Sequence, residues 1–125
     1  MKLEYLAAGS PDYPLIRLYD FMRAEAAELL STVAKLANGE LLCVAVAELP
    51  FITAIDGCQL SILSGTWDAG VVQLPDGSFN CRLTPDTWDN VASLIEPFTK
   101  AAAGYQWLVG MPGEAALLLS VNGQW

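Results

Sequence analysis

The sequence contains no histidine and few basic residues. Histidine is the commonest general base, and both the Ser-His-Asp and the Cys-His arrangements require it, so one chain cannot build either of them. Six lysines and arginines stand against 14 aspartates and glutamates, which gives a formal net charge of −8. Because nucleic acids and anionic lipid surfaces are bound through basic patches, we expect neither a nucleic acid nor a membrane as partner.

Long apolar runs and cofactor motifs are absent as well. The longest uncharged apolar run, 41–47, is far shorter than the roughly 18 residues of a membrane-spanning helix. The glycine-rich patterns that cradle phosphates do not occur, and the cysteines are too scattered to suggest a closed set of metal ligands. We therefore expect no cofactor and no metal.

The three cysteines, Cys43, Cys58 and Cys81, do not form a disulfide framework, because their number is odd and no two are close in sequence. This usage favours a reducing, cytoplasmic compartment. Cys43 lies in an apolar run, which predicts a small buried side chain. Cys58 follows Asp56-Gly57 in an expected loop, so we predict that it is the cysteine most able to react.

Two helices are predicted, at about 22–38 and 85–97. Apolar residues recur at helical spacing in both segments. Asn38-Gly39 is typical of a helix end, and Thr84-Pro85 is typical of a helix start. Pro97 should end or kink the second helix.

The rest of the chain has the composition of strands, and 54% of all residues are hydrophobic, which is enough for a continuous core. Pro75-Asp76-Gly77 indicates a hairpin between strands at 70–74 and 78–83. We predict a single α+β domain over residues 1–125, with a mainly antiparallel sheet of about six to eight strands and both helices packed on one face. The other sheet face must then be polar, curled on itself or used as an interface.

One unusual cluster surrounds Arg17, which lies in a strand expected at 14–21. A guanidinium with Tyr19 and Tyr13 nearby could grip an anionic ligand. Alternatively, Arg17 forms a structural ion pair, because a buried arginine needs a carboxylate or several carbonyl groups. Strand alternation places Asp20 on the opposite face, so the partner of Arg17 should come from elsewhere in the chain.

Four tryptophans are present, and their positions differ in kind. Trp88 and Trp107 match the core periodicity, whereas Trp67 lies in an expected loop and Trp125 is the last residue. An exposed tryptophan is a common anchor of protein interfaces, so Trp67 is a candidate contact residue. The tripeptide Thr-Trp-Asp occurs at 66–68 and again at 87–89, and we interpret the repetition as coincidence.

Two functional hypotheses follow from these features. The first is a small acidic cytoplasmic binding or regulatory module without catalytic activity, with a protein partner or a second copy of itself, and with Arg17, Tyr19, Asp20 and Trp67 as candidate binding residues. The alternative is a small-ligand binder or enzyme that uses Arg17, Tyr19, Asp20 and Cys58.

Overall fold

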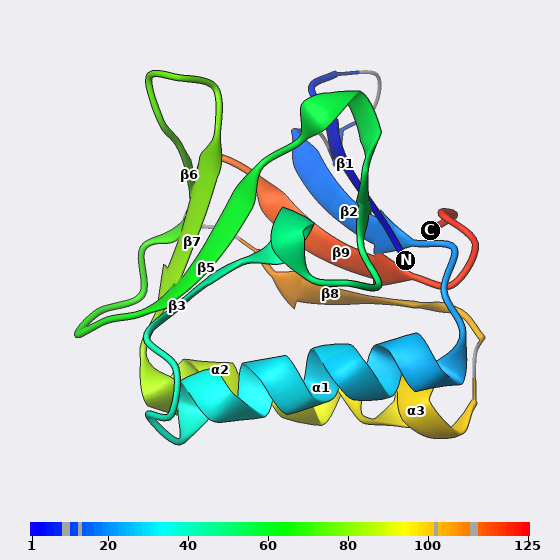
Figure 1. Ribbon diagram of the computed structural model, residues 1–125. Coiled ribbons are helices and arrows are strands. Elements are labelled where there is room, and N and C mark those ends of the chain that lie inside the picture. Colours follow the sequence, from blue (N-terminus) through cyan, green and yellow to red (C-terminus); the bar gives the residue numbers. More distant parts are fainter. Residues whose placement is uncertain (9–10, 13, 102, 111–112) are drawn as a thin grey trace.

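Two β-sheets stand against each other above a layer of helices (Figure 1). The computed structural model describes residues 1–8, 11–12, 14–101, 103–110 and 113–125. The five-stranded sheet has the order β4-β1-β2-β9-β8, with strands β1 (Lys2–Leu6), β2 (Leu15–Tyr19), β4 (Thr53–Ala54), β8 (Tyr105–Val109) and β9 (Ala116–Ser120). The four-stranded sheet has the order β3-β5-β7-β6, with strands β3 (Cys43–Ala45), β5 (Leu60–Ser64), β6 (Gly70–Gln73) and β7 (Phe79–Leu83).

Both predicted helices are present and lie side by side beneath the sheets (Figure 1). Helix α1 spans Arg23–Ala37 and helix α2 spans Pro85–Ile95. The Thr84 hydroxyl accepts a hydrogen bond from the backbone N–H of Thr87, so Thr84 caps α2 as expected. Pro97 ends α2 and begins the short helix α3 (Pro97–Lys100).

The hydrophobic core fills the space between the inner faces of the two sheets and the helices. Ile16 and Leu18 enter it from the five-stranded sheet, and Leu60 and Ile62 enter it from the four-stranded sheet. Trp88 of α2 is 1% exposed, and its indole N–H donates to the carbonyl of Leu63 at 2.8 Å. That bond ties the helix layer to β5 and satisfies the polar atom of a buried tryptophan.

The α+β class is confirmed, but the sheet prediction needs correction. The described residues form nine strands in two sheets instead of one sheet of six to eight strands. Three of the strand pairings are parallel, namely β1 with β4, β2 with β9 and β5 with β7. A long twisted sheet tends to split into two sheets that pack face to face. Crossover connections, which pass through helices or intervening strands, allow two strands to pair in parallel.

The segment 40–49, which belongs to the part of the chain with strand composition, is largely irregular. Only Cys43–Ala45 pairs, with β5, and the chain then turns through a short 3₁₀ helix, Val46–Glu48. Apolar composition alone does not distinguish a strand from a buried turn in so short a run. Across the described residues, no helix combines the length and the apolar character needed to cross a membrane.

Candidate functional site

Arg17 is held in a structural ion pair on the outer face of the five-stranded sheet. Its Nε and Nη2 atoms donate to Oε1 of Glu4, at 2.9 and 2.6 Å. Glu4 lies opposite Arg17 on the neighbouring strand β1, which explains why the local sequence around Arg17 did not reveal the partner. The guanidinium also lies over the ring of Tyr19, 4.0 Å from its centroid.

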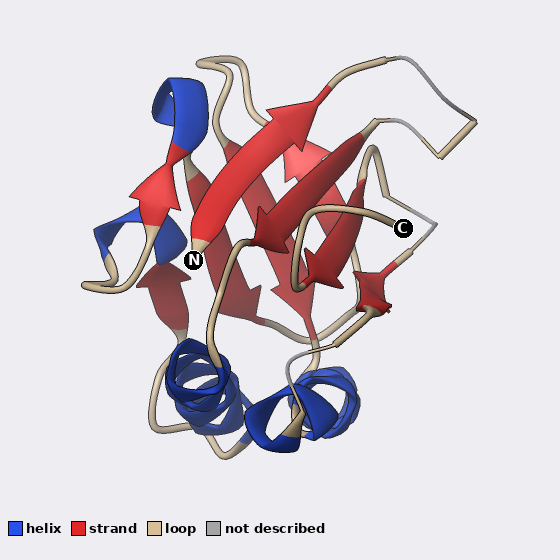
Figure 2. Cartoon of the chain, turned by 90° about the vertical axis from the view of Figure 1, so that its right-hand side faces the viewer, coloured by secondary structure: helices blue, strands red, loops and turns tan. Residues whose placement is uncertain are grey.

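The remaining contact of Arg17 secures the C-terminal tail, residues 121–125. Nη1 donates to the carbonyl of Gly123 at 2.8 Å. Figure 2 shows the tail crossing the face of the five-stranded sheet that is turned away from the four-stranded sheet. The Ser120 hydroxyl donates to the carbonyl of Gln124, and the Trp125 indole N–H donates to Asp12. Gly123 also lies against Tyr19, where an added methyl group would come within 3.0 Å of the ring, so Arg17 and Tyr19 together form a clamp for the tail.

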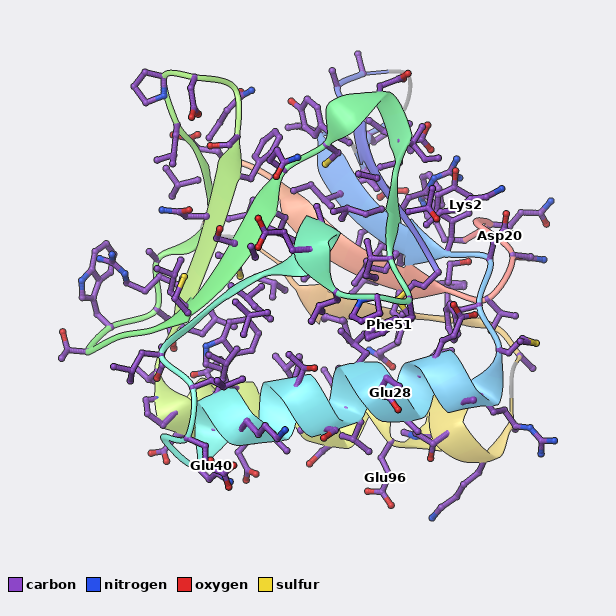
Figure 3. The ribbon with its side chains drawn as sticks, viewed as in Figure 1. Lys2, Asp20, Glu28, Glu40, Phe51 and Glu96 are labelled. Carbon is purple, nitrogen blue, oxygen red and sulfur yellow. The ribbon has the colours of Figure 1, made fainter. Side chains whose placement is uncertain are left out.

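Asp20 does not join this clamp. Its carboxylate pairs with Lys2 at 2.9 Å, and each of the two side chains is a little under half exposed (Figure 3). Asp20 has a φ of +52°, a left-handed conformation that aspartate tolerates better than most residues. Tyr13, the other aromatic residue considered near Arg17, lies outside the described residues.

The cysteine predictions are reversed. Cys43 is exposed on the edge strand β3, whereas Cys58 and Cys81 are buried. Burial, together with the nearby Glu4 carboxylate, raises the pKa of the Cys58 thiol to about 11. Cys58 is therefore a protonated core residue, and the structure does not bring it to Arg17 as part of one site.

The outer face of the four-stranded sheet is a different kind of surface. Strand register and alternation place these side chains on it: Cys43, Ala45, Ser61, Leu63, Gly70, Val72, Asn80 and Arg82. Among these strand residues, Arg82 alone carries a charge. The face turns away from the core, and none of the described helices or strands covers it (Figure 1). We call it the outer sheet face.

Trp67 stands at one end of the outer sheet face and is 58% exposed. Leu42, 70% exposed, lies at the same end, because its carbonyl accepts the N–H of Ser64 just before the Trp67 loop. Large apolar side chains this exposed at one end of a face with little charge are typical of interaction surfaces.

The loop that carries Trp67 is fixed at three points. The N–H groups of Gly65 and Ala69 donate to carbonyls of β7, at 3.0 and 2.9 Å. Between them, Asp68 accepts the backbone N–H of Thr84 and the hydroxyl of Thr87, each at 2.8 Å. These bonds lower the pKa of Asp68, because they stabilise its charged form. Trp67 is thus presented to solvent on a rigid support, which reduces the entropy that binding would cost.

A groove runs beside Trp67 along β6 and β7. It holds about 240 Å³, and its lining includes Trp67, Val72, Leu74, Asn80 and Arg82. The Arg82 stem lies against Gly65, where a methyl group would come within 2.7 Å of Cδ. Sequence reasoning identified Trp67 but missed Arg82 and Val72. The alternation of Phe79, Cys81 and Leu83 with Asn80 and Arg82 was the available signal for their outward position.

Comparison with known proteins identifies no family model, no curated protein and no solved structure that matches this chain.

Proposed function

We propose that the protein is a small acidic cytoplasmic binding or regulatory module without catalytic activity, and that it binds another protein through the outer sheet face. The observation that carries this proposal is the exposed Trp67 on its anchored loop, beside a sheet face with little charge. A rigid aromatic anchor in a mostly apolar setting is the arrangement that dominates binding energy at protein interfaces.

The distribution of charge supports this choice of face. The exposed acids Glu28 and Glu96 lie in the helix layer, Glu28 on α1 and Glu96 between α2 and α3, and Glu96 points away from the sheets (Figure 3). Carboxylates are costly to bury in an interface, so a face without them is the surface that a partner can cover with the smallest desolvation penalty. The net charge of −8 keeps the rest of the molecule soluble.

The cysteines support the proposed compartment. An exposed Cys43 and two buried free thiols suit a reducing environment, in which an exposed thiol persists without forming disulfides.

The alternative hypothesis, a small-ligand binder or enzyme built on Arg17, Tyr19, Asp20 and Cys58, gains no support from the geometry. Arg17 already contacts Glu4, Gly123 and Tyr19, so an anionic ligand would have to displace internal partners. Asp20 pairs with Lys2, and the Cys58 thiol is buried.

The test compares two exposed aromatic residues on different sheets. Tagged wild-type protein, Trp67→Ala and Tyr105→Ala would be used to capture partners from the native cell lysate at low and high salt. Tyr105 is 50% exposed on β8, so its variant removes a similar side chain far from the outer sheet face. Any captured protein would be identified, purified and titrated against all three forms.

A partner whose affinity falls at least about tenfold in Trp67→Ala and stays unchanged in Tyr105→Ala is the expected result. A second copy of this chain would be recognised by sedimentation equilibrium of the purified protein, and a dimer broken by Trp67→Ala would identify the protein as its own partner. A partner whose affinity is insensitive to Trp67 would overturn the assignment to the outer sheet face.

A further inference from the structure

Among the described residues, Arg82 is the one cation on the outer sheet face, and no carboxylate pairs with it. Lys2, Arg17 and Lys100 pair with Asp20, Glu4 and Glu96, respectively. Within the described ranges, Arg82 takes part in no ion pair and its side chain donates no hydrogen bond, although acids outnumber bases 14 to 6. Arg23 and Lys35 also form no ion pair among the described residues, but both are exposed on α1. Arg82 is half-buried on an uncovered sheet face beside a groove, so its guanidinium is available to a carboxylate of another molecule.

The groove beside Arg82 limits what that molecule can be. Trp67, Val72 and Leu74 give it apolar walls, and none of the described residues that line it is acidic. An apolar side chain seated there would bury against these walls, and a carboxylate at the Arg82 end would accept a forked pair of N–H bonds. A basic side chain in the same position would meet Arg82 as a like charge.

We propose that the groove binds a segment of a partner protein in which an aspartate or glutamate stands next to a large apolar residue, with the carboxylate on Arg82 and the apolar side chain against Trp67. This inference rests on the proposed function and deepens it by naming the chemistry of the bound segment. The net charge of −8 does not oppose it at physiological salt, because charges farther than about 8 Å apart are screened, whereas the Arg82 contact is direct.

A nucleic acid does not fit the same features. Phosphate binding gains affinity from several cations together, and the outer sheet face provides Arg82 alone. A segment of a second copy could supply a carboxylate, and sedimentation of the wild-type protein distinguishes that source from a separate partner.

The experiment uses three peptides that differ in one position, acetyl-Ala-Leu-X-Phe-Ala-amide with X as Asp, Asn or Lys. Each would be titrated to millimolar concentration into nitrogen-15-labelled full-length protein, with the Trp67 indole N–H and the Val72 and Asn80 amides as reporters. We expect the Asp peptide to bind about fivefold more tightly than the Asn peptide, and the Lys peptide to bind most weakly.

Two variants locate the effect at Arg82. Arg82→Gln should remove the preference for Asp over Asn, whereas Arg23→Gln, which changes the charge equally at an exposed site on α1, should keep it. Gly65→Ala should reduce the preference, because the added methyl group displaces the Arg82 stem. Circular dichroism would establish that each variant is folded.

Three results would overturn the inference: equal binding of the Asp and Asn peptides, tightest binding of the Lys peptide, or no shift of the reporters with any peptide. The proposed function can be contradicted independently of this inference. If a captured partner depends on Trp67 and not on Arg82, the binding face stands and the carboxylate assignment is wrong. If the partner is insensitive to Trp67, the face itself is wrong.

Discussion

The Asp68 carboxylate accepts a hydrogen bond from the Thr87 hydroxyl at 2.8 Å, and this bond joins the two Thr-Trp-Asp tripeptides of the chain. The tripeptide repeat, interpreted from sequence as coincidence, therefore includes a direct contact between its two copies. The two tryptophans have opposite surroundings: Trp88 is buried under β5, and Trp67 is exposed. Asp68 fastens the loop of the exposed tryptophan to the start of the helix that carries the buried one.

Replacing Asp68 should loosen the Trp67 loop and change the stability of the fold at acidic pH. We expect Asp68→Asn to lower the free energy of unfolding by about 1 kcal/mol at neutral pH, because an amide matches two hydrogen-bond donors less well than a carboxylate does. Chemical denaturation at pH 7 measures this loss. Faster amide hydrogen exchange at 65–69 would locate the change in the loop.

The stabilisation that the Asp68 carboxylate contributes should decrease as the pH falls. The folded pKa of Asp68 is lowered from its usual value of 3.8, so the stabilisation is present above that pH and is lost as the pH falls through the folded pKa. The stability difference between wild type and Asp68→Asn should therefore shrink below about pH 4. A constant difference down to pH 2 would show that the charge of Asp68 does not stabilise the loop.

The Arg17 clamp should affect stability and the C-terminal tail. Arg17→Ala leaves Glu4 without its partner in a half-buried position and frees the carbonyl of Gly123. We expect a loss of about 2 kcal/mol, equivalent to roughly 5–10 °C in melting temperature. Hydrogen exchange should also become faster at 121–125.

The control for this variant is Lys100→Ala, which removes an exposed ion pair with Glu96 and should change the melting temperature by less than about 2 °C. An unchanged melting temperature in Arg17→Ala would contradict the clamp. Partner binding through the outer sheet face should survive this substitution, because Arg17 lies on the other sheet.

Much of the architecture was predictable because it depends on local chemistry. Thr84 and Pro97 mark the ends of α2 through a side-chain cap and a missing N–H, and the Pro75-Asp76-Gly77 turn fixes the β6–β7 hairpin. These signals act over a few residues and need no knowledge of the rest of the fold.

The pairing of distant segments was not predictable in the same way. Strand alternation alone puts Arg17 and Tyr19 on one face of β2, but only the register of β1 against β2 brings Glu4 to Arg17. The exposure of Cys43 likewise depends on β3 being an edge strand, which its apolar composition does not reveal. Arg82 stands out only when the strand order places it on an uncovered face beside Trp67.

The thiols provide a test of burial that needs no partner. In native protein, Ellman's reagent should modify Cys43 rapidly, and Cys58 and Cys81 should react only after unfolding. Cys43→Ser should therefore remove the fast phase while leaving two thiols that titrate in denaturant. A thiol that still reacts rapidly in Cys43→Ser would contradict the burial of Cys58 and Cys81. A reactive Cys58 would favour the small-ligand hypothesis.

Alkaline pH should weaken the fold through the same two buried thiols. Burial raises the pKa of Cys58 to about 11 and that of Cys81 to about 12, from a usual value of 9.0. Stability is therefore fully present below about pH 9 and declines as the pH rises toward these folded values, because the unfolded chain ionises first. Urea midpoints measured from pH 8 to pH 11 would detect the decline, and a flat profile would contradict it.

Fluorescence quenching tests whether Trp67 is presented as an anchor. Trp88 is buried, and Trp107 and Trp125 are half-buried, so acrylamide should rapidly quench a component of about a quarter of the emission. Trp67→Phe should abolish that component, whereas Trp107→Phe should leave it in place. Because the loop is fixed by Asp68, the Trp67 emission should also show high anisotropy, and Asp68→Asn should lower it. Uniform protection of all four tryptophans would show that Trp67 packs against the protein, and the outer sheet face would then lack its anchor.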